Sequence, residues 1–145
     1  MNPVRLTLAI YLLLIGLLVS YPIGPARAPH KVKWLNDAKP GNTEAMVRDV
    51  VTNVGLFLPV GLLAGRAFGV TATALLLVVV GGGLLSLGIE TAQHLFLPWR
   101  YSTWVDVVSN TAGTALGAGA AWLVAPARTW LGSPPTSTDP SPGHQ

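Results

Sequence analysis

Four long apolar segments constrain this chain more than any other feature of its sequence. They cover residues 4–21, 49–65, 69–90 and 105–125. Each approaches the roughly 20 residues that an α-helix needs to cross a bilayer core of about 30 Å. Backbone amides in hydrocarbon must be hydrogen-bonded within their own segment, so we expect helices even at the valine run 78–80. The sequence therefore predicts an all-α integral membrane protein, a bundle of four transmembrane helices that crosses the cell membrane several times.

The composition supports this fold class and argues against several functions. Half of the 145 residues are hydrophobic and only 10% are charged, unlike a soluble domain. Cysteine is absent, and the three histidines, at positions 30, 94 and 144, show no metal-ligand spacing. The net charge of +3 comes from scattered Lys and Arg without a basic block. Phosphate-binding loops and nucleophile elbows are also missing. We expect no metal, no cofactor and no nucleic-acid partner.

The stretches between the apolar segments divide the chain into four regions. We predict residues 1–23 to be a first transmembrane helix that acts as a signal anchor, 24–42 a polar loop, 43–125 a helical membrane domain and 126–145 a disordered proline-rich tail. A cleaved signal peptide is the alternative for the first region, because the sequence at 26–28 has a small residue on either side of Arg27. Pro29 after that site and the length of the segment favour the anchor. A tight turn at 66–68 is expected to join the second and third helices as antiparallel neighbours.

Alternation of four helices across a bilayer would gather polar residues at one membrane face. We call the side that holds the N-terminus side A and the opposite side B. Residues three and four positions apart share a helix face, so each of the last three helices carries one polar ridge. An acid at the bilayer centre costs about 2.5 to 3.5 kcal/mol, so the ridges should face one another. The sequence predicts a binding pocket at side B, formed by Asp49, Asn53, Glu90, Gln93, Arg100, Asp106 and Asn110.

Each of these residues also has a purely structural interpretation. We expect Asp49 and Asp106 near helix N-termini, where a carboxylate caps free amides. The asparagines at 53 and 110 would bridge helices. Glu90 is predicted to end its helix, where the macrodipole disfavours a negative charge, and Arg100 is the expected partner. A structural ion pair and a binding or proton-handling site both remain open.

Two sequence patterns concern helix packing. Asp-Val-Val-Thr-Asn at 49–53 is echoed by Asp-Val-Val-Ser-Asn at 106–110, which indicates either two parallel helices around a pseudo-symmetric pocket or a chance match in a valine-rich chain. Gly113 and Gly117 predict a close approach of the fourth helix to a neighbour, and the glycines at 81–83 predict similar packing. Pro59 should kink the second helix and free the carbonyl of Gly55.

Three ordered blocks of residues resemble the VanZ-like family over about residues 44–124. The blocks are Arg48, Asp49, Asn53, Phe57, Pro59 and Gly61; then Ser86, Glu90 and Gln93; then Arg100, Ser102, Asp106, Asn110, Gly113 and Gly117. The resemblance implies a small multi-helix membrane protein of the cell envelope, in a family named for a member associated with low-level resistance to teicoplanin. It marks the seven predicted pocket residues as characteristic positions without assigning roles to them.

These observations lead to three functional hypotheses. The first is an envelope membrane protein, linked to glycopeptide resistance, whose pocket binds a polar or anionic group with Arg100 supplying charge; a lipid-linked envelope precursor or a glycopeptide would be its partner beside the bilayer. The second is an intramembrane hydrolase or transferase that uses Glu90 or an Asp as general base on a lipid-linked substrate. The third is a transport or assembly subunit. The resemblance and Arg5 place side B outside, against a slight excess of Lys and Arg on side B. The sequence predicts no oligomeric state.

Overall fold

The computed structural model describes residues 2–20, 43–97 and 103–125. They form four α-helices: α1 (Pro3–Ser20), α2 (Thr43–Phe68), α3 (Ala72–Phe96) and α4 (Trp104–Leu123). The predicted all-α architecture is therefore confirmed for the described ranges. The predicted loop 24–42, the tail 126–145 and Arg100 lie outside them.

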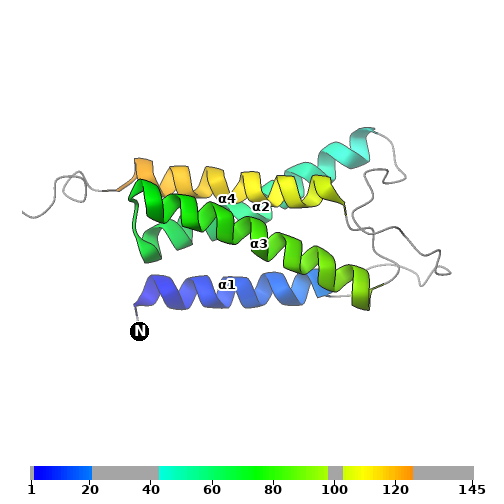
Figure 1. The fold of residues 1–145 in the computed structure, drawn as a ribbon, viewed down its shortest axis with the longest axis horizontal. Helices are drawn as coiled ribbons and strands as arrows, with labels where there is room; N and C mark the ends of the chain where they lie inside the picture. Colours follow the sequence, from blue (N-terminus) through cyan, green and yellow to red (C-terminus); the bar gives the residue numbers. More distant parts are fainter. Residues whose placement is uncertain (1, 21–42, 98–102, 126–145) are drawn as a thin grey trace, which may run out of the picture.

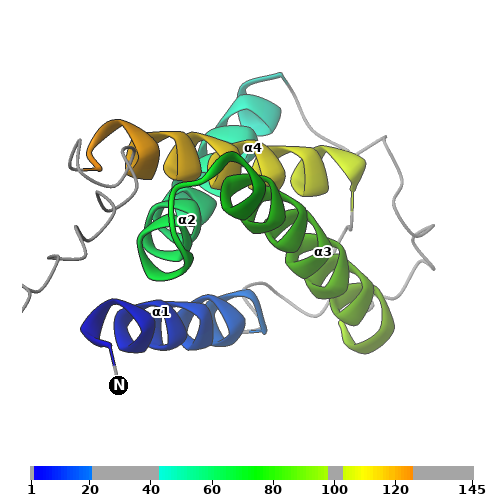
Figure 2. The same cartoon turned by 60° about the vertical axis from the view of Figure 1, so that its left-hand side comes forward.

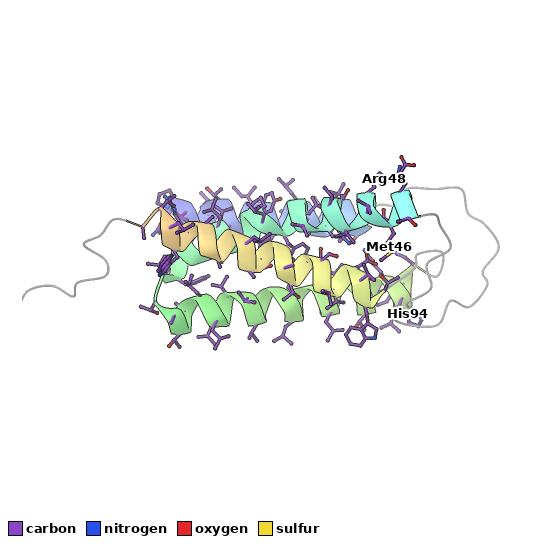
Figure 3. The ribbon with its side chains drawn as sticks, turned by 90° about the horizontal axis from the view of Figure 1, so that it is seen from above. Met46, Arg48 and His94 are labelled. Atoms are coloured by element: carbon purple, nitrogen blue, oxygen red, sulfur yellow. The ribbon has the colours of Figure 1, made fainter. Side chains whose placement is uncertain are left out.

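The four helices lie lengthwise beside one another and alternate in direction (Figure 1). At the right-hand end of Figure 1, α1 and α3 end while α2 and α4 begin. Met46 and Arg48 of α2 lie at the same end of the bundle as His94 of α3 (Figure 3). This arrangement is the one that the alternation argument requires, and we call this end of the bundle the side-B end.

Three of the four helices are long and apolar enough to cross a membrane: α1, residues Met46–Phe68 of α2, and α3. The predicted membrane crossing is thus supported for three helices, whereas a crossing by α4 stays a prediction. The sequence of α4 is rich in Gly, Ala, Ser and Thr, which lowers its hydropathy. Small residues suit a helix that packs against protein along much of its surface, because they let other helices approach closely. Its buried residues are Asp106, Ser109, Asn110, Gly113, Thr114, Gly117, Ala118 and Ala121.

Several predicted helix boundaries are wrong by up to two turns. Helix α3 continues to Phe96 instead of ending at 90, and α2 includes six residues before the apolar segment that starts at 49. The turn lies at 69–71 and not at 66–68, because Gly69 adopts a φ of +111°, in the left-handed region that glycine tolerates best. The Thr71 hydroxyl then accepts a hydrogen bond from the Ala74 amide at 3.2 Å and begins α3.

The closest packing in the bundle joins the parallel helices α2 and α4 through glycines. A Cβ atom on Gly117 would overlap the backbone carbonyl of Leu58, and one on Gly61 would overlap that of Thr114. A Cβ atom on Gly113 would likewise overlap the backbone carbonyl of Val54. The predicted close approach of the fourth helix is confirmed, with α2 as the neighbour.

The glycines of α3 contribute to packing in part. A Cβ on Gly82 would overlap the side chain of Thr114, which is fully buried. Gly83 lies near the Thr111 hydroxyl, whereas the Cβ position of Gly81 is open. The prediction of close packing at 81–83 therefore holds for the residues that face α4.

Helix α1 lies at the periphery of the bundle. It contacts α2 and, more sparsely, α3, and it does not touch α4; Figure 2 shows it on the side opposite α4. Leu8 packs with Ala64 and Ala67, and Ile15 packs with Phe57 and Val60. Leu12 and Val19 are half-buried against these clusters. Six other large apolar side chains of α1 are exposed, as expected for a surface that contacts lipid: Leu6, Ile10, Leu13, Leu14, Leu17 and Leu18.

Candidate polar site at the side-B end

The start of α4 carries a group of hydrogen-bonded polar side chains that also includes α2. The Asn53 amide nitrogen Nδ2 donates to Asp106 Oδ1 at 2.7 Å, and the Thr103 hydroxyl donates to Asp106 Oδ2 at 2.6 Å. Thr103 also accepts from the Asp106 backbone amide at 3.2 Å as the cap of α4. Asp106 is only 7% exposed. Both of its carboxylate oxygens thus accept a hydrogen bond in a largely water-free position.

Asn110, one turn further into α4, connects that helix to α3. Its Nδ2 donates to Ser86 Oγ at 2.8 Å, and both side chains are buried. The other amide atom, Asn110 Oδ1, is buried and accepts no hydrogen bond within the described part of the chain. A buried acceptor in this state normally signals an additional partner, such as water or a ligand group.

Glu90 lies on the same face of α3 as Ser86, one turn closer to the side-B end. Helices α3 and α4 run in opposite directions, so the bond between Ser86 and Asn110 places Glu90 level with Asp106. Glu90 is only 5% exposed. The prediction that it ends its helix is wrong, because α3 runs on to Phe96. Burial of the carboxylate, and not the helix dipole, is what requires compensation here.

Gln93 connects α3 to α1. It is 5% exposed, and its Nε2 donates to the backbone carbonyl of Val19 at 3.1 Å. Val19 belongs to the last turn of α1, where carbonyl groups have no partner within the helix. Beside this bond, a crevice of about 150 Å³ lies between α1 and α3, lined by Val19, Ser20, Ile89, Ala92, Gln93, Phe96 and Leu97.

Two further predicted pocket residues are Asp49 and Arg100. Asp49 is half-buried and lies well inside α2, which begins at Thr43, so its interpretation as a helix cap is wrong. Arg100 lies outside the described residues, and its pairing with Glu90 stays a prediction. Five members of the predicted set are thus placed in the hydrogen-bonded or buried part of the side-B end: Asn53, Glu90, Gln93, Asp106 and Asn110.

The repeated Asp-Val-Val-x-Asn segments lie side by side, because Asn53 of the first donates to Asp106 of the second. Their asparagines nevertheless have different partners, since Asn110 donates to Ser86 of α3. The bond joins the last residue of the first segment to the first residue of the second, so it shows that the segments are in contact but does not pair equivalent residues. The two repeated segments therefore do not form equivalent hydrogen bonds.

Sequence reasoning did not include Thr103 in the site. Its signal was available, because Thr103 and Asp106 are spaced as in a capping box before an apolar helix. Tyr11 was also missed: its hydroxyl donates to the Leu56 carbonyl at 3.0 Å. The carbonyl expected to be freed by Pro59 was that of Gly55. The carbonyl that accepts from Tyr11 is that of the next residue, Leu56, in the same turn of α2.

We call the residues Asn53, Ser86, Glu90, Gln93, Thr103, Asp106 and Asn110 the side-B network. It contains carboxylate, amide and hydroxyl groups, and none of the buried side chains in the described ranges is Lys or Arg. Nor do those ranges hold a group of three or more His, Asp or Glu suited to a metal ion. The network is therefore rich in hydrogen-bond acceptors, and its chemical complement is a group with N–H or O–H donors.

Comparison with known proteins gives one family. A family model described as VanZ/LLP1 matches residues 8–125, which includes all four helices except the first five residues of α1. No curated protein and no solved structure matches the chain significantly.

Proposed function

The chain belongs to the VanZ/LLP1 family, and on this premise we propose that it is a cell-envelope membrane protein that binds the polar head of an amphiphilic envelope component at the side-B network. Family membership and three apolar spans identify a multi-pass membrane protein. The proposal extends this to a link with susceptibility to glycopeptides of the teicoplanin type. The ligand would be a lipid-linked envelope precursor or the glycopeptide itself.

One observation carries the proposal: two acids, Glu90 and Asp106, are buried at the same level of facing helices. Burying a carboxylate is costly, and a well-packed apolar pair would serve stability at least as well. Polar groups inside membrane bundles are accordingly concentrated at functional sites. The buried Asn110 Oδ1, which accepts no hydrogen bond from the described residues, supplies a further acceptor for a ligand.

The chemistry of the network favours a particular class of head group. Its described members offer acceptors to hydroxyl, amide or ammonium groups, as found in sugars and peptides. An anionic head group would instead need the charge of Arg100, as the sequence hypothesis assumed. Changing Arg100 to Ala distinguishes these cases, because only binding of an anionic head group should be lost.

The proposal is tested by glycopeptide susceptibility in a parent strain where this gene has a measurable effect. We expect Glu90→Gln and Asp106→Asn each to return susceptibility to the level of the deletion strain. Glu44→Gln is the matched control, because Glu44 is an exposed acid on α2. Membrane levels are compared by immunoblot. Full activity of both network variants at normal protein levels would refute the proposal.

The carboxyl groups of Glu90 and Asp106, which lie at the same height along facing helices, also favour a second candidate function. This function is acid and base chemistry on a lipid-linked substrate. A pair of carboxyl groups is the common requirement for general acid and general base roles. The purified protein should then turn over a lipid-linked cell-wall intermediate with a pH dependence that Glu90→Gln abolishes while the fold persists. Absence of turnover across the pH range would exclude this candidate and leave the binding proposal intact.

We further propose that side B faces the exterior, where envelope precursors and glycopeptides are found. With four crossings, the C-terminus then lies in the cytoplasm. A reporter enzyme fused after residue 145 should give a cytoplasmic signal. An exterior signal would show either the opposite orientation or a fourth helix that does not cross.

A further inference from the structure

The crevice between the ends of α1 and α3 lies directly beside the side-B network. Gln93 belongs to both: it is buried with the network, and it lines the crevice. Glu90 is three residues before Gln93 on the same helix face. An amphiphile whose head group reaches the network therefore has the crevice as the adjacent place for its apolar part.

The lining of the crevice suits hydrocarbon. Val19, Ile89, Ala92, Phe96 and Leu97 form most of it, and Gln93 and Ser20 are its polar members. The two helices that form it, α1 and α3, are both apolar enough to span a membrane, and the crevice lies at the side-B ends of these two helices. Its side-chain chemistry and its position both indicate a lipid chain as the occupant.

The size of the crevice limits the ligand to a single chain. Its volume is about 150 Å³, below the roughly 300 Å³ at which pockets for whole drug-sized ligands begin. This is room for part of one chain and not for two chains side by side or for a head group.

The contact between α1 and α3 is sparse, which lets a chain enter from the bilayer. Among the helix pairs that touch, this pair has the fewest contacts. Two side-chain hydrogen bonds that α1 donates, from Arg5 to the Ala67 carbonyl and from Tyr11 to the Leu56 carbonyl, go to α2. The bond from Gln93 to Val19 joins α1 to α3 at the crevice itself. Gln93 therefore positions one wall of the crevice while its neighbours contact the chain.

We infer that the crevice binds the hydrocarbon chain of a single-chain amphiphile whose donor-bearing head group occupies the side-B network. This inference rests on the proposed function and names its ligand class. A phospholipid with two chains is the alternative occupant, and the experiment is designed to detect it.

The test uses the full chain in phosphatidylcholine nanodiscs. The probe is an alkyl maltoside with a nitroxide at the end of its single chain, and the comparison is a two-chain maltoside lipid labelled in the same way. Electron paramagnetic resonance measures the immobilised fraction of each. Ala92→Trp fills the crevice from an exposed position, and Ala115→Trp is the matched control on α4, which does not touch α1.

We expect the wild type and Ala115→Trp to immobilise the single-chain probe, and Ala92→Trp to bind it at least about tenfold more weakly. The two-chain lipid should be immobilised weakly by all three proteins. Equal binding by wild type and Ala92→Trp would overturn the inference, and so would equal immobilisation of the two-chain lipid. If Ala92→Trp does not assemble, judged by its circular dichroism and elution volume, Ala92→Leu provides the same comparison with a smaller side chain.

The outcome is separable from that of the proposed function. Loss of the susceptibility phenotype in Glu90→Gln together with unchanged probe binding in Ala92→Trp would refute the crevice and leave the head-group site standing. Loss of probe binding in Ala92→Trp with a normal phenotype in Glu90→Gln would refute the head-group site and leave a chain-binding crevice.

Discussion

Helices α4 and α1 are both in contact with α2, but they are attached in different ways. The contact between α2 and α4 is so close that glycines face opposing backbone carbonyls. Helix α1 instead buries two side chains, Leu8 and Ile15, in apolar clusters and uses hydrogen bonds from side chains to carbonyl groups. In lipid, apolar area alone gives little drive for association, so close packing and interhelical hydrogen bonds must hold helices together. The comparison indicates a rigid pair, α2 with α4, and a more weakly attached α1.

Because of this difference, the candidate site lies between the rigid pair of α2 and α4 and the more weakly attached α1. The network residues on α2 and α4 belong to the rigid pair, whereas the crevice beside Gln93 depends on where α1 lies. A site with a precise head-group end and an adjustable chain end fits an amphiphilic ligand. Three substitutions test the contrast between the two attachments.

The largest effect is expected at Gly117. There is no room for a leucine at this position, because its Cβ would overlap the Leu58 carbonyl. The substitution Gly117→Leu should therefore force α2 and α4 apart. Overpacked cores lose about 1 to 3 kcal/mol and occasionally more, and we expect the upper end for a clash with backbone. Unfolding in a detergent titration measures it. Gly119→Leu is the control, since nothing lies within 4 Å of its Cβ position; equal losses at both sites would contradict the close contact.

An intermediate effect is expected for Asn53→Ala. It removes the donor that bonds Asp106 Oδ1 at 2.7 Å and leaves a buried carboxylate with one fewer partner. Hydrogen bonds to charged groups contribute about 1.5 to 3 kcal/mol. Thr52→Ala, at an exposed neighbouring position, should change the unfolding free energy much less. In the double variant with Asp106→Asn the losses should be clearly non-additive, and simple additivity would argue against a direct bond.

The smallest effect is expected for Tyr11→Phe, which removes the hydrogen bond to the Leu56 carbonyl and keeps the ring. Hydrogen bonds between membrane helices contribute about 0.6 kcal/mol on average and about 1.7 at most. Thr7→Val is the control, because that hydroxyl bonds only to Pro3 within α1. A loss for Tyr11→Phe as large as that for Gly117→Leu would mean that α1 is as firmly attached as α4.

Sequence patterns predicted the helices well and their ends poorly. Hydrophobic length located all four helices, because lipid imposes helical hydrogen bonding on any apolar segment. It could not locate the turn, since α2 extends past Arg66 to a glycine with positive φ. The same error placed Asp49 and Glu90 at helix ends, although both lie inside helices.

Within the site, residue spacing predicted which positions share a face but not which atoms bond. The ridge that contains Ser86 and Glu90 and the one that contains Asp106 and Asn110 follow from the helical period. That Asn53 donates to Asp106, whereas Asn110 donates to Ser86, depends on the rotation and register of three helices, which no local pattern contains.

The amino-acid sequence by itself determined that this chain is a helical membrane protein, because long apolar segments in lipid must form helices. Only the tertiary structure decided that α4 packs its glycines against α2, that Glu90 and Asp106 are buried at one level, and that α1 leaves a crevice beside Gln93. The physical reason is that association of helices in lipid depends on how surfaces fit, and fit is a property of pairs of helices.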